Sequence, residues 1–403
     1  MLRTNVSACA RLLSIALTLA APAAHRANAD EARVPVALAA LTTGGVAVVD
    51  PAAGKLVKII GGLGESTFGI AVNPVRPAQA WATDEKAGLL HEVDLSAGTA
   101  TGVVVDLAPG ATVRSTHQPV ITADGRYVLV TVPGDETLTI VSTTTRAVTK
   151  VPMKNDPHIV DIDRFTGHVF VSRRGALRGA TFLDLEKLAA RFDLERGGTL
   201  TDIDIAGLEQ AGAFLAIPIS GAPRVITALG ASRFALAMYG KRGPLVYEVS
   251  GGKARLVDDL DNVIATRPRE PKGNLEYLEA QAVSRDGRTL VGTDQGIPSC
   301  LRVWELDASG RALAERCAIP LAAEPYWVNV APSGATAWVT VPKFKDASGA
   351  ERPGQVLTVD VASGRVTSTV QITGTDGRLH SPKRMVVEAL PASFLSTMTG
   401  GVR

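Results

Sequence analysis

The chain contains few cysteines and aromatic residues, no large excess of basic residues and no long apolar run beyond its start. These scarcities exclude several classes of protein. Its 403 residues include three cysteines, too few for a fold built on disulfides. Aromatic residues make up only 4% of the chain. Lys plus Arg (42) nearly balance Asp plus Glu (40), so the chain lacks the basic surface that concentrates nucleic acid. Beyond residue 30, no stretch reaches the eighteen apolar residues expected of a membrane-spanning helix.

The first thirty residues differ from the rest and resemble an export signal. Arg3 and Arg11 precede an apolar stretch at 12–24, and Ala27-Asn28-Ala29 forms a small-residue cleavage site. We therefore predict a secretory signal peptide over 1–29. An uncleaved anchor is the alternative, but the apolar stretch is short for one. The mature chain is expected to be soluble, periplasmic or secreted, without a membrane span. Removing three leader arginines changes the formal charge from +2 to −1.

A two-part sequence repeat fills the remainder of the chain. The first part is an alternating apolar run, a polar turn and a second run ending in Thr or Ser, as in 120–131, 282–293 and 329–340. The second part places Asp and Gly around a tight turn, as in 44–60 and 355–372. Alternation with period two and turns of this composition indicate β-hairpins. Two hairpins per repeat make four antiparallel strands, which is one blade of a β-propeller.

These two phrases resemble the halves of the YVTN-type propeller repeat over roughly residues 40–390. The resemblance implies an all-β, seven-bladed β-propeller. The predicted blades open near Val34, Phe68, His117, His158, Pro223, Glu279 and Tyr326.

The segment 380–390, which resembles a single strand outside the repeat, predicts how the propeller ring closes. It has no hairpin after it, so we expect the C-terminus to supply the inner strand of the first blade, since an open ring would expose sheet edges. The propeller then occupies 34–391 as one domain, followed by a flexible tail at 392–403. The segment 184–213 breaks the repeat and has helical spacing, which predicts a helical excursion on the fourth blade.

Two cysteines of the mature chain fall in one predicted hairpin. If Ala308 and Ser309 form a two-residue turn, Cys300 lies opposite Cys317 at a non-hydrogen-bonded pair, where Cα atoms are closest. A disulfide could bridge that distance, and an oxidising compartment favours it. Two buried thiols are the alternative.

Polar residues recur at one fixed position of the repeat. Fourteen residues before the final Thr or Ser of four first hairpins stand His117, His158, Glu279 and Tyr326. Less regular copies place Phe68 or Gly69 and Pro223 or Arg224 near this position, and the closing strand brings His380, Lys383 and Arg384. Equivalent positions of a propeller ring the mouth of its central channel. We therefore predict a ligand site at the channel mouth formed by His117, His158, Arg224, Glu279, Tyr326, His380 and Lys383; a solvated funnel without a ligand is the alternative.

The sequence favours a non-enzymatic binding or scaffold protein that presents this mouth to a small molecule or a periplasmic protein. It has no G-x-S-x-G, H-E-x-x-H, P-loop or haem-attachment motif. No cofactor or metal is predicted. Resemblance to exported propellers leaves two alternatives. One is a redox accessory, similar to the methylamine dehydrogenase large subunit or to propellers that handle d1 haem, with a haem-type cofactor at the mouth. The other is a metal-dependent lactonase-like hydrolase, with a divalent metal at the mouth and Glu279 as its carboxylate.

Overall fold

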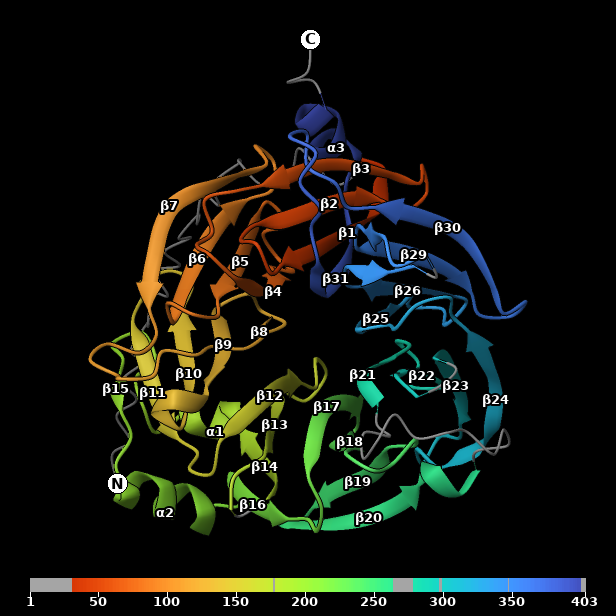
Figure 1. Ribbon diagram of the computed structural model, residues 1–403. Helices are drawn as coiled ribbons and strands as arrows, with labels where there is room; N and C mark the ends of the chain where they lie inside the picture. The colour runs from red at the N-terminus through yellow and green to blue at the C-terminus, as the bar shows by residue number, and fades with distance from the viewer. Residues whose placement is uncertain (1–30, 177, 264–277, 297–298, 347, 400–403) are drawn as a thin grey trace, which may run out of the picture. The chain divides into compact units, whose positions relative to one another are not determined.

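The computed structural model describes residues 31–176, 178–263, 278–296, 299–346 and 348–399. The predicted signal peptide lies outside these residues. From Arg33 onward, seven four-stranded antiparallel sheets surround a central opening, which confirms the seven-bladed β-propeller (Figure 1). None of the described helices combines the length and the apolar character needed to cross a bilayer.

The innermost strands of the seven blades contact one another around the opening and close the ring. They are β31 (Pro382–Pro391) in blade 1, then β4 (Thr67–Val72), β8 (Pro119–Ile121), β12 (Pro157–Ile162), β17 (Pro223–Gly230), β21 (Leu278–Val283) and β25 (Trp327–Val330) in blades 2 to 7.

Outward from each inner strand, the blades add three more. The second strands are β1 (Arg33–Leu41), β5 (Gln79–Asp84), β9 (Tyr127–Val132), β13 (His168–Arg173), β18 (Arg233–Met238), β22 (Thr289–Asp294) and β26 (Thr336–Val341). The third strands are β2 (Val46–Asp50), β6 (Leu89–Asp94), β10 (Thr137–Ser142), β14 (Gly179–Asp184), β19 (Leu245–Ser250), β23 (Cys300–Leu306) and β29 (Gln355–Asp360). The fourth strands are β3 (Lys55–Ile60), β7 (Thr99–Asp106), β11 (Val148–Pro152), β16 (Phe214–Pro218), β20 (Lys253–Asp259), β24 (Ala312–Pro320) and β30 (Arg365–Gln371).

Blade 1 joins the two ends of the propeller. Strand β31 pairs antiparallel with β1 from Arg33 opposite Pro391 to Leu41 opposite Pro382, with one bulge. The predicted closure by a C-terminal strand is therefore confirmed. Residues 392–399, expected to belong to a flexible tail, instead form helix α3 (Ala392–Thr399), which buries Met398.

Blade 4 carries the predicted helical excursion between its third and fourth strands. Helix α1 (Leu185–Ala189) is capped by Asp184, and α2 (Asp202–Gln210) begins with a capping box. Between them β15 (Gly198–Thr199) pairs parallel with β11, so this insertion adds a fifth strand to the outer edge of blade 3. Two single-turn 3-10 helices, η2 (Pro133–Asp135) and η3 (Leu260–Val263), lie in other connections.

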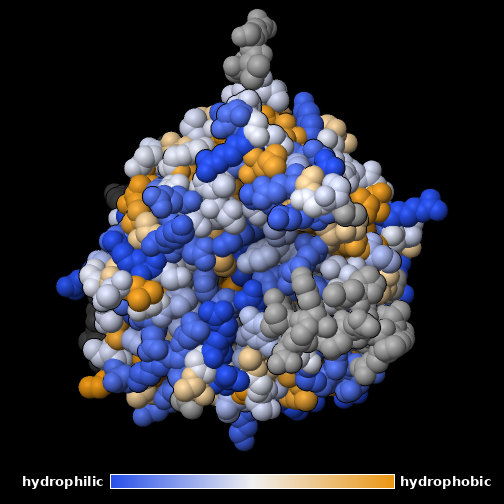
Figure 2. Space-filling view, viewed as in Figure 1, coloured by the Kyte–Doolittle hydropathy of each residue, from blue (hydrophilic) through white to orange (hydrophobic). Residues whose placement is uncertain are grey.

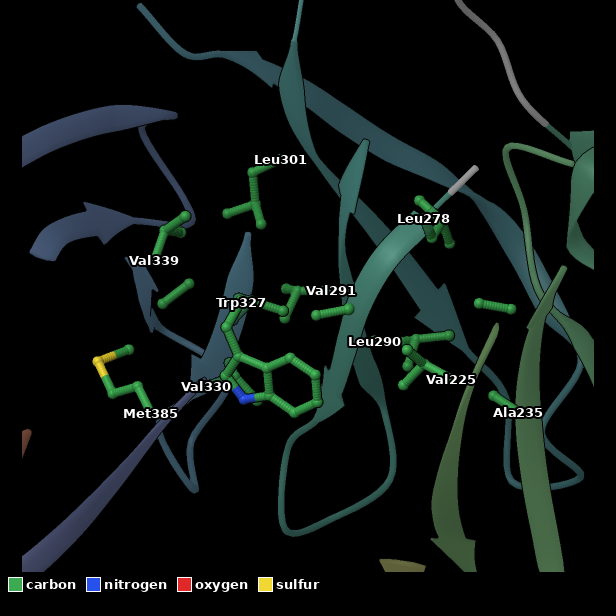
Figure 3. Packing of buried hydrophobic residues seen from close by; sticks show 14 of the residues in the cluster. Val225, Ala235, Leu278, Leu290, Val291, Leu301, Trp327, Val330, Val339 and Met385 are labelled. Carbon is green, nitrogen blue, oxygen red and sulfur yellow. The ribbon is translucent and has the colours of Figure 1, made fainter. Parts of the chain in front are cut away.

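The core lies between neighbouring blades rather than at one centre. Figure 3 shows side chains from blades 5, 6 and 7, including Val291, Leu301, Trp327 and Val339, packed together. Because both faces of each sheet meet a neighbour, Val, Leu, Ile and Ala fill consecutive strand positions. Burial of these apolar side chains is the main force that holds the blades together.

The register predicted for the two cysteines is wrong. Cys300 lies opposite Pro320, and Cys317 lies opposite Val303. The turn has one more residue than predicted, since the amide of Asp307 donates to the carbonyl of Arg311, and two bulges follow it. The two residues are therefore three positions apart along the ladder, or about 10 Å along the strand, beyond the 4.4–6.8 Å that disulfides usually span. The observed register therefore does not support the predicted disulfide between Cys300 and Cys317.

Candidate functional site

One residue within two positions of the start of each inner strand lies at the same end of the central channel. Going around the ring, these residues are Phe68, His117, His158, Arg224, Glu279, Tyr326 and Lys383. We call them the mouth ring. Contacts join neighbouring members: Phe68 stacks on His117, His117 meets His158 edge-on, and Arg224 pairs with Glu279. The fixed sequence offset thus identified side chains that do come together. Figure 2 shows hydrophilic residues gathered around the centre of the displayed face.

Hydroxyl side chains at the end of the second strands position this ring. Thr131, Thr293 and Thr340 each donate to the carbonyl of a mouth-ring residue of the following blade, namely His158 (2.6 Å), Tyr326 (3.4 Å) and Lys383 (2.6 Å). This blade-to-blade hydrogen bond gives the repeat its recurring Thr and fixes the height of each mouth residue along the channel.

The two histidines form a chain of hydrogen bonds through blades 3, 4 and 5. Nδ1 of His117 lies 2.7 Å from the carbonyl oxygen of His158, and Nδ1 of His158 lies 2.8 Å from that of Arg224. A carbonyl can only accept, so both Nδ1 atoms carry the proton and both Nε2 atoms of the neutral rings are acceptors. Burial lowers the pKa of His117 to about 3, helped by the charge of Arg384, and burial also lowers the pKa of His158 well below its ordinary value. Both imidazoles are therefore neutral at physiological pH.

Arg224, Glu279 and Tyr326 form a buried polar group on the opposite side of the ring. The guanidinium of Arg224 binds both carboxylate oxygens of Glu279, Nε to Oε2 at 3.1 Å and Nη2 to Oε1 at 2.5 Å. Tyr326 donates a further hydrogen bond to this carboxylate. Burial raises the pKa of Glu279, which is 1% exposed, while Arg224 opposes that rise; burial also raises the pKa of Tyr326 to about 12. The bidentate pair keeps Glu279 ionised at neutral pH.

The closing strand contributes two cations with different partners. Lys383 forms an ion pair with Glu85 at 2.7 Å and lies over the ring of Phe68. Arg384 lies between the rings of Phe68 and Trp327, at 4.3 and 4.1 Å from their centroids. Both cations of the closing strand therefore pack against aromatic side chains at the channel mouth.

His380 does not join the mouth ring. Its Nδ1 lies 2.6 Å from Oγ1 of Thr43, in the turn between β1 and β2. Since it precedes Lys383 by three residues, it belongs to the connection leading into β31 and not to the strand itself. Among the described residues it shows no hydrogen bond or ring contact with a member of the mouth ring, so its role in the site stays a prediction.

A cavity of about 460 Å³ opens beside the buried polar group. We call it the mouth cavity. Its lining comprises Arg224, Glu279, Gln295, Glu324, Tyr326, Pro342, Lys343 and Phe344. Three of these residues were predicted, and Gln295, Glu324, Pro342, Lys343 and Phe344 were missed. The missed signal was the stretch 341–354, which interrupts the repeat and forms the hairpin of β27 (Phe344–Lys345) and β28 (Glu351–Arg352).

The donor groups of the mouth do not fit a metal ion. Among the described residues, no three His, Cys, Asp or Glu side chains come together in an arrangement that could hold one. The Nδ1 atoms of the two histidines are used by backbone carbonyls, and both oxygens of Glu279 are used by Arg224. We therefore assign no chemical step to a metal.

Comparison with known proteins supports the fold but identifies no family. The sequence matches no protein-family model, so the YVTN assignment is not confirmed, and no curated protein matches it. Among solved structures, the chain is similar to the periplasmic gluconolactonase PpgL of Pseudomonas aeruginosa, with a TM-score of 0.62 and 18% identity over 89% of this chain and 99% of that one. It is also similar to a protein from Lactobacillus plantarum (TM-score 0.61, 12% identity, covering 88% and 99%) and to one of unknown function from Desulfotomaculum acetoxidans (0.62, 13%, covering 87% and 98%). At these identities the likeness establishes a shared seven-bladed propeller architecture.

Proposed function

We propose that this protein hydrolyses a small lactone of a polyhydroxy acid in the mouth cavity. The observation that carries the proposal is the cavity itself, which brings two carboxylates, two cations, a tyrosine hydroxyl and an aromatic ring to a space of about 460 Å³. A volume in this range suits a small organic ligand. Support also comes from a gluconolactonase with the same propeller architecture.

The chemistry needs a base for water and donors for the carbonyl oxygen. In the proposed reaction, Glu324 takes a proton from a water molecule as its oxygen bonds to the lactone carbonyl carbon. Arg224 and Tyr326 donate hydrogen bonds to the oxygen that becomes negatively charged, as in an oxyanion hole. The bond from carbonyl carbon to ring oxygen then breaks, and Glu324 returns the proton to that oxygen. The products are a hydroxy acid, which loses its own proton to solvent, and the unchanged protein.

Glu279 is a positioning residue in this scheme. Both its oxygens bind Arg224, so it cannot also take a proton from water without giving up that pair. It holds the guanidinium at the edge of the cavity and accepts the hydroxyl of Tyr326 when no ligand is bound.

Binding without hydrolysis is the second candidate. It is favoured by the ion pairs Arg224–Glu279 and Lys383–Glu85, which satisfy two carboxylates of the mouth and leave them poorly suited to act as bases. The signal-peptide pattern and the periplasmic neighbour support a periplasmic or secreted location for either candidate.

The deciding experiment measures hydrolysis of D-glucono-1,5-lactone by residues 30–403, against its spontaneous rate, in a pH-stat near pH 6. We expect acceleration by the wild-type protein and loss of roughly 100-fold or more in kcat for Glu324→Gln, with unchanged folding. Glu305→Gln, which removes an exposed carboxylate of β23 outside the cavity, is the matched control. No acceleration but saturable binding of the lactone would support the second candidate. Neither acceleration nor binding would refute both.

A further inference from the structure

Arg384 is a buried cation at the channel mouth without a carboxylate partner among the described residues. Its side chain is 2% exposed, and its Nη1 donates to the neutral amide oxygen of Gln118 at 2.7 Å. Its Nε has no hydrogen-bond partner in the described part of the chain. Arg302 in blade 6 is equally buried but pairs with both Asp294 and Glu315. Charged side chains are rarely buried without such compensation.

Two aromatic rings pack against the guanidinium of Arg384. Phe68 and Trp327 both lie within cation–π distance of it, and such contacts offset part of the cost of burial. Hydrogen bonds of a guanidinium lie in its plane, so an additional partner must approach edge-on. A planar carboxylate is the acceptor that fits this edge best.

Among the described residues, the other cations near Arg384 already have carboxylate partners. The nearby cations Lys383, Arg224 and Arg174 each pair with a carboxylate, at Glu85, Glu279 and Asp156 respectively. His117 and His158 are neutral because burial lowers their pKa values. Among the described cations of the mouth, Arg384 is therefore the one that forms no ion pair with a carboxylate.

The two neutral histidines add a second recognition element. Neither Nε2 atom has a hydrogen-bond partner among the described residues, and the side chains keep a small exposed fraction, 6% for His117 and 3% for His158. These atoms can accept hydrogen bonds but cannot donate them. Acceptors of this kind suit the hydroxyl groups of a ligand.

We propose that Arg384 binds the carboxylate of a hydroxy acid at the channel mouth, with His117 and His158 accepting hydrogen bonds from its hydroxyl groups. The subsite combines Arg384 of blade 1 with the two histidines of blades 3 and 4, and the contact of Arg384 with Trp327 of blade 7 brings it close to Tyr326 of the mouth cavity. The inference deepens the proposed function, since the hydroxy acid is the class of product that lactone hydrolysis releases. It does not require hydrolysis, because a binding protein could use the same subsite.

The test compares two ligands on the unmodified protein by isothermal titration calorimetry at pH 7.5. D-Gluconate and D-glucitol carry similar hydroxyl groups, and only gluconate has a carboxylate. We expect gluconate to bind at least about tenfold more tightly and to weaken as salt rises from 0.05 to 0.5 M. Equal affinities would overturn the proposal. Tighter binding of inorganic phosphate than of gluconate would overturn the carboxylate assignment.

Variants then locate the binding. Arg384→Gln should remove the preference for gluconate over glucitol, and Arg378→Gln, an exposed arginine before β31, should leave it intact. Because Arg384→Gln could impair folding, its thermal unfolding is measured alongside, and the comparison of the two ligands needs no variant at all. Gluconate binding without lactone hydrolysis would refute only the enzymatic proposal. Hydrolysis without any preference for gluconate would refute only this one.

Discussion

The Nδ1 atom of His117 lies 2.7 Å from the carbonyl oxygen of His158, so the side chain of one blade is tied to the backbone of the next. His158 repeats the arrangement toward Arg224. Each imidazole is thereby held in one tautomer, with its proton on the buried side and its lone pair on the other. This tie makes the mouth ring sensitive to protonation.

Acid should destabilise the protein through His117. Its folded pKa, about 3, lies below the unfolded value near 6.5, so the unfolded chain binds more protons between these pH values. The stability that the neutral ring contributes is complete above about pH 6.5 and is lost as pH falls toward 3. For this group alone the loss is about 3 kcal/mol at pH 4.5.

Denaturant unfolding of the wild type and of His117→Gln at pH 7.5 and 4.5 measures this effect. The variant should be less stable than wild type at pH 7.5, having lost a hydrogen bond, and should lose less stability on acidification. A variant whose stability falls with pH as steeply as that of wild type would show that His117 does not titrate as described.

Removing one partner of the Arg224–Glu279 pair should cost more than removing both. Arg224→Met leaves the carboxylate of Glu279 buried without its cation, which should lower the unfolding free energy by about 3 to 5 kcal/mol. Adding Glu279→Gln should recover part of that loss. Chemical denaturation of the two single variants and the double variant gives the coupling energy. If the losses of unfolding free energy in the two single variants add up to the loss in the double variant, the interaction between Arg224 and Glu279 does not stabilise the protein.

Phe344 should contribute to substrate binding rather than to the chemical step. It lines the mouth cavity from the hairpin of blade 7, where its ring can cover the apolar face of a sugar-like ligand. Phe344→Ala is expected to raise KM about five- to twentyfold and to leave kcat within a factor of about three. Phe165→Ala, at an exposed position in the turn before β13, is the control. A fall in kcat with unchanged KM would contradict this role.

Loss of the closing strand should abolish cooperative folding. A chain ending at Gly377 lacks β31, so β1 loses its pairing partner and the ring its seventh inner strand. We expect no sharp thermal transition by circular dichroism. A chain ending at Pro391 lacks only α3 and should still melt cooperatively. A sharp transition in the shorter chain would refute closure as a requirement for folding.

The sequence was informative where the repeat is regular. The interval of fourteen residues from Thr131 back to His117 recurs because one threonine hydroxyl spans two blades at the same height in each copy. Position in the repeat therefore predicted position in space. Arg224 followed the same rule in a less regular repeat, whereas Lys383 was predicted from its place on the closing strand.

Prediction failed where extra residues enter the repeat. A turn one residue longer than predicted and two bulges in β24 together move Cys317 three positions from Cys300, and single-residue insertions of this kind leave the apolar alternation nearly unchanged. Most of the missed cavity residues lie in connections, where the backbone path depends on tertiary packing. Gln295 follows β22, Glu324 precedes β25, and Phe344 belongs to an inserted hairpin. The helix beyond Pro391 was not predicted from the sequence, since it is short and its Met398 is buried only in the folded protein.

The pairing of β1 with β31 also determines when the first blade can finish folding. Strand β1 is among the first parts of the propeller to be synthesised, yet its partner is among the last, more than 300 residues later. Contacts so distant along the chain form slowly, since a long loop must close first. Until the last strand is available, an edge of the first blade stays open to pairing with other chains. A cell making this protein must therefore keep the chain from aggregating until synthesis is complete.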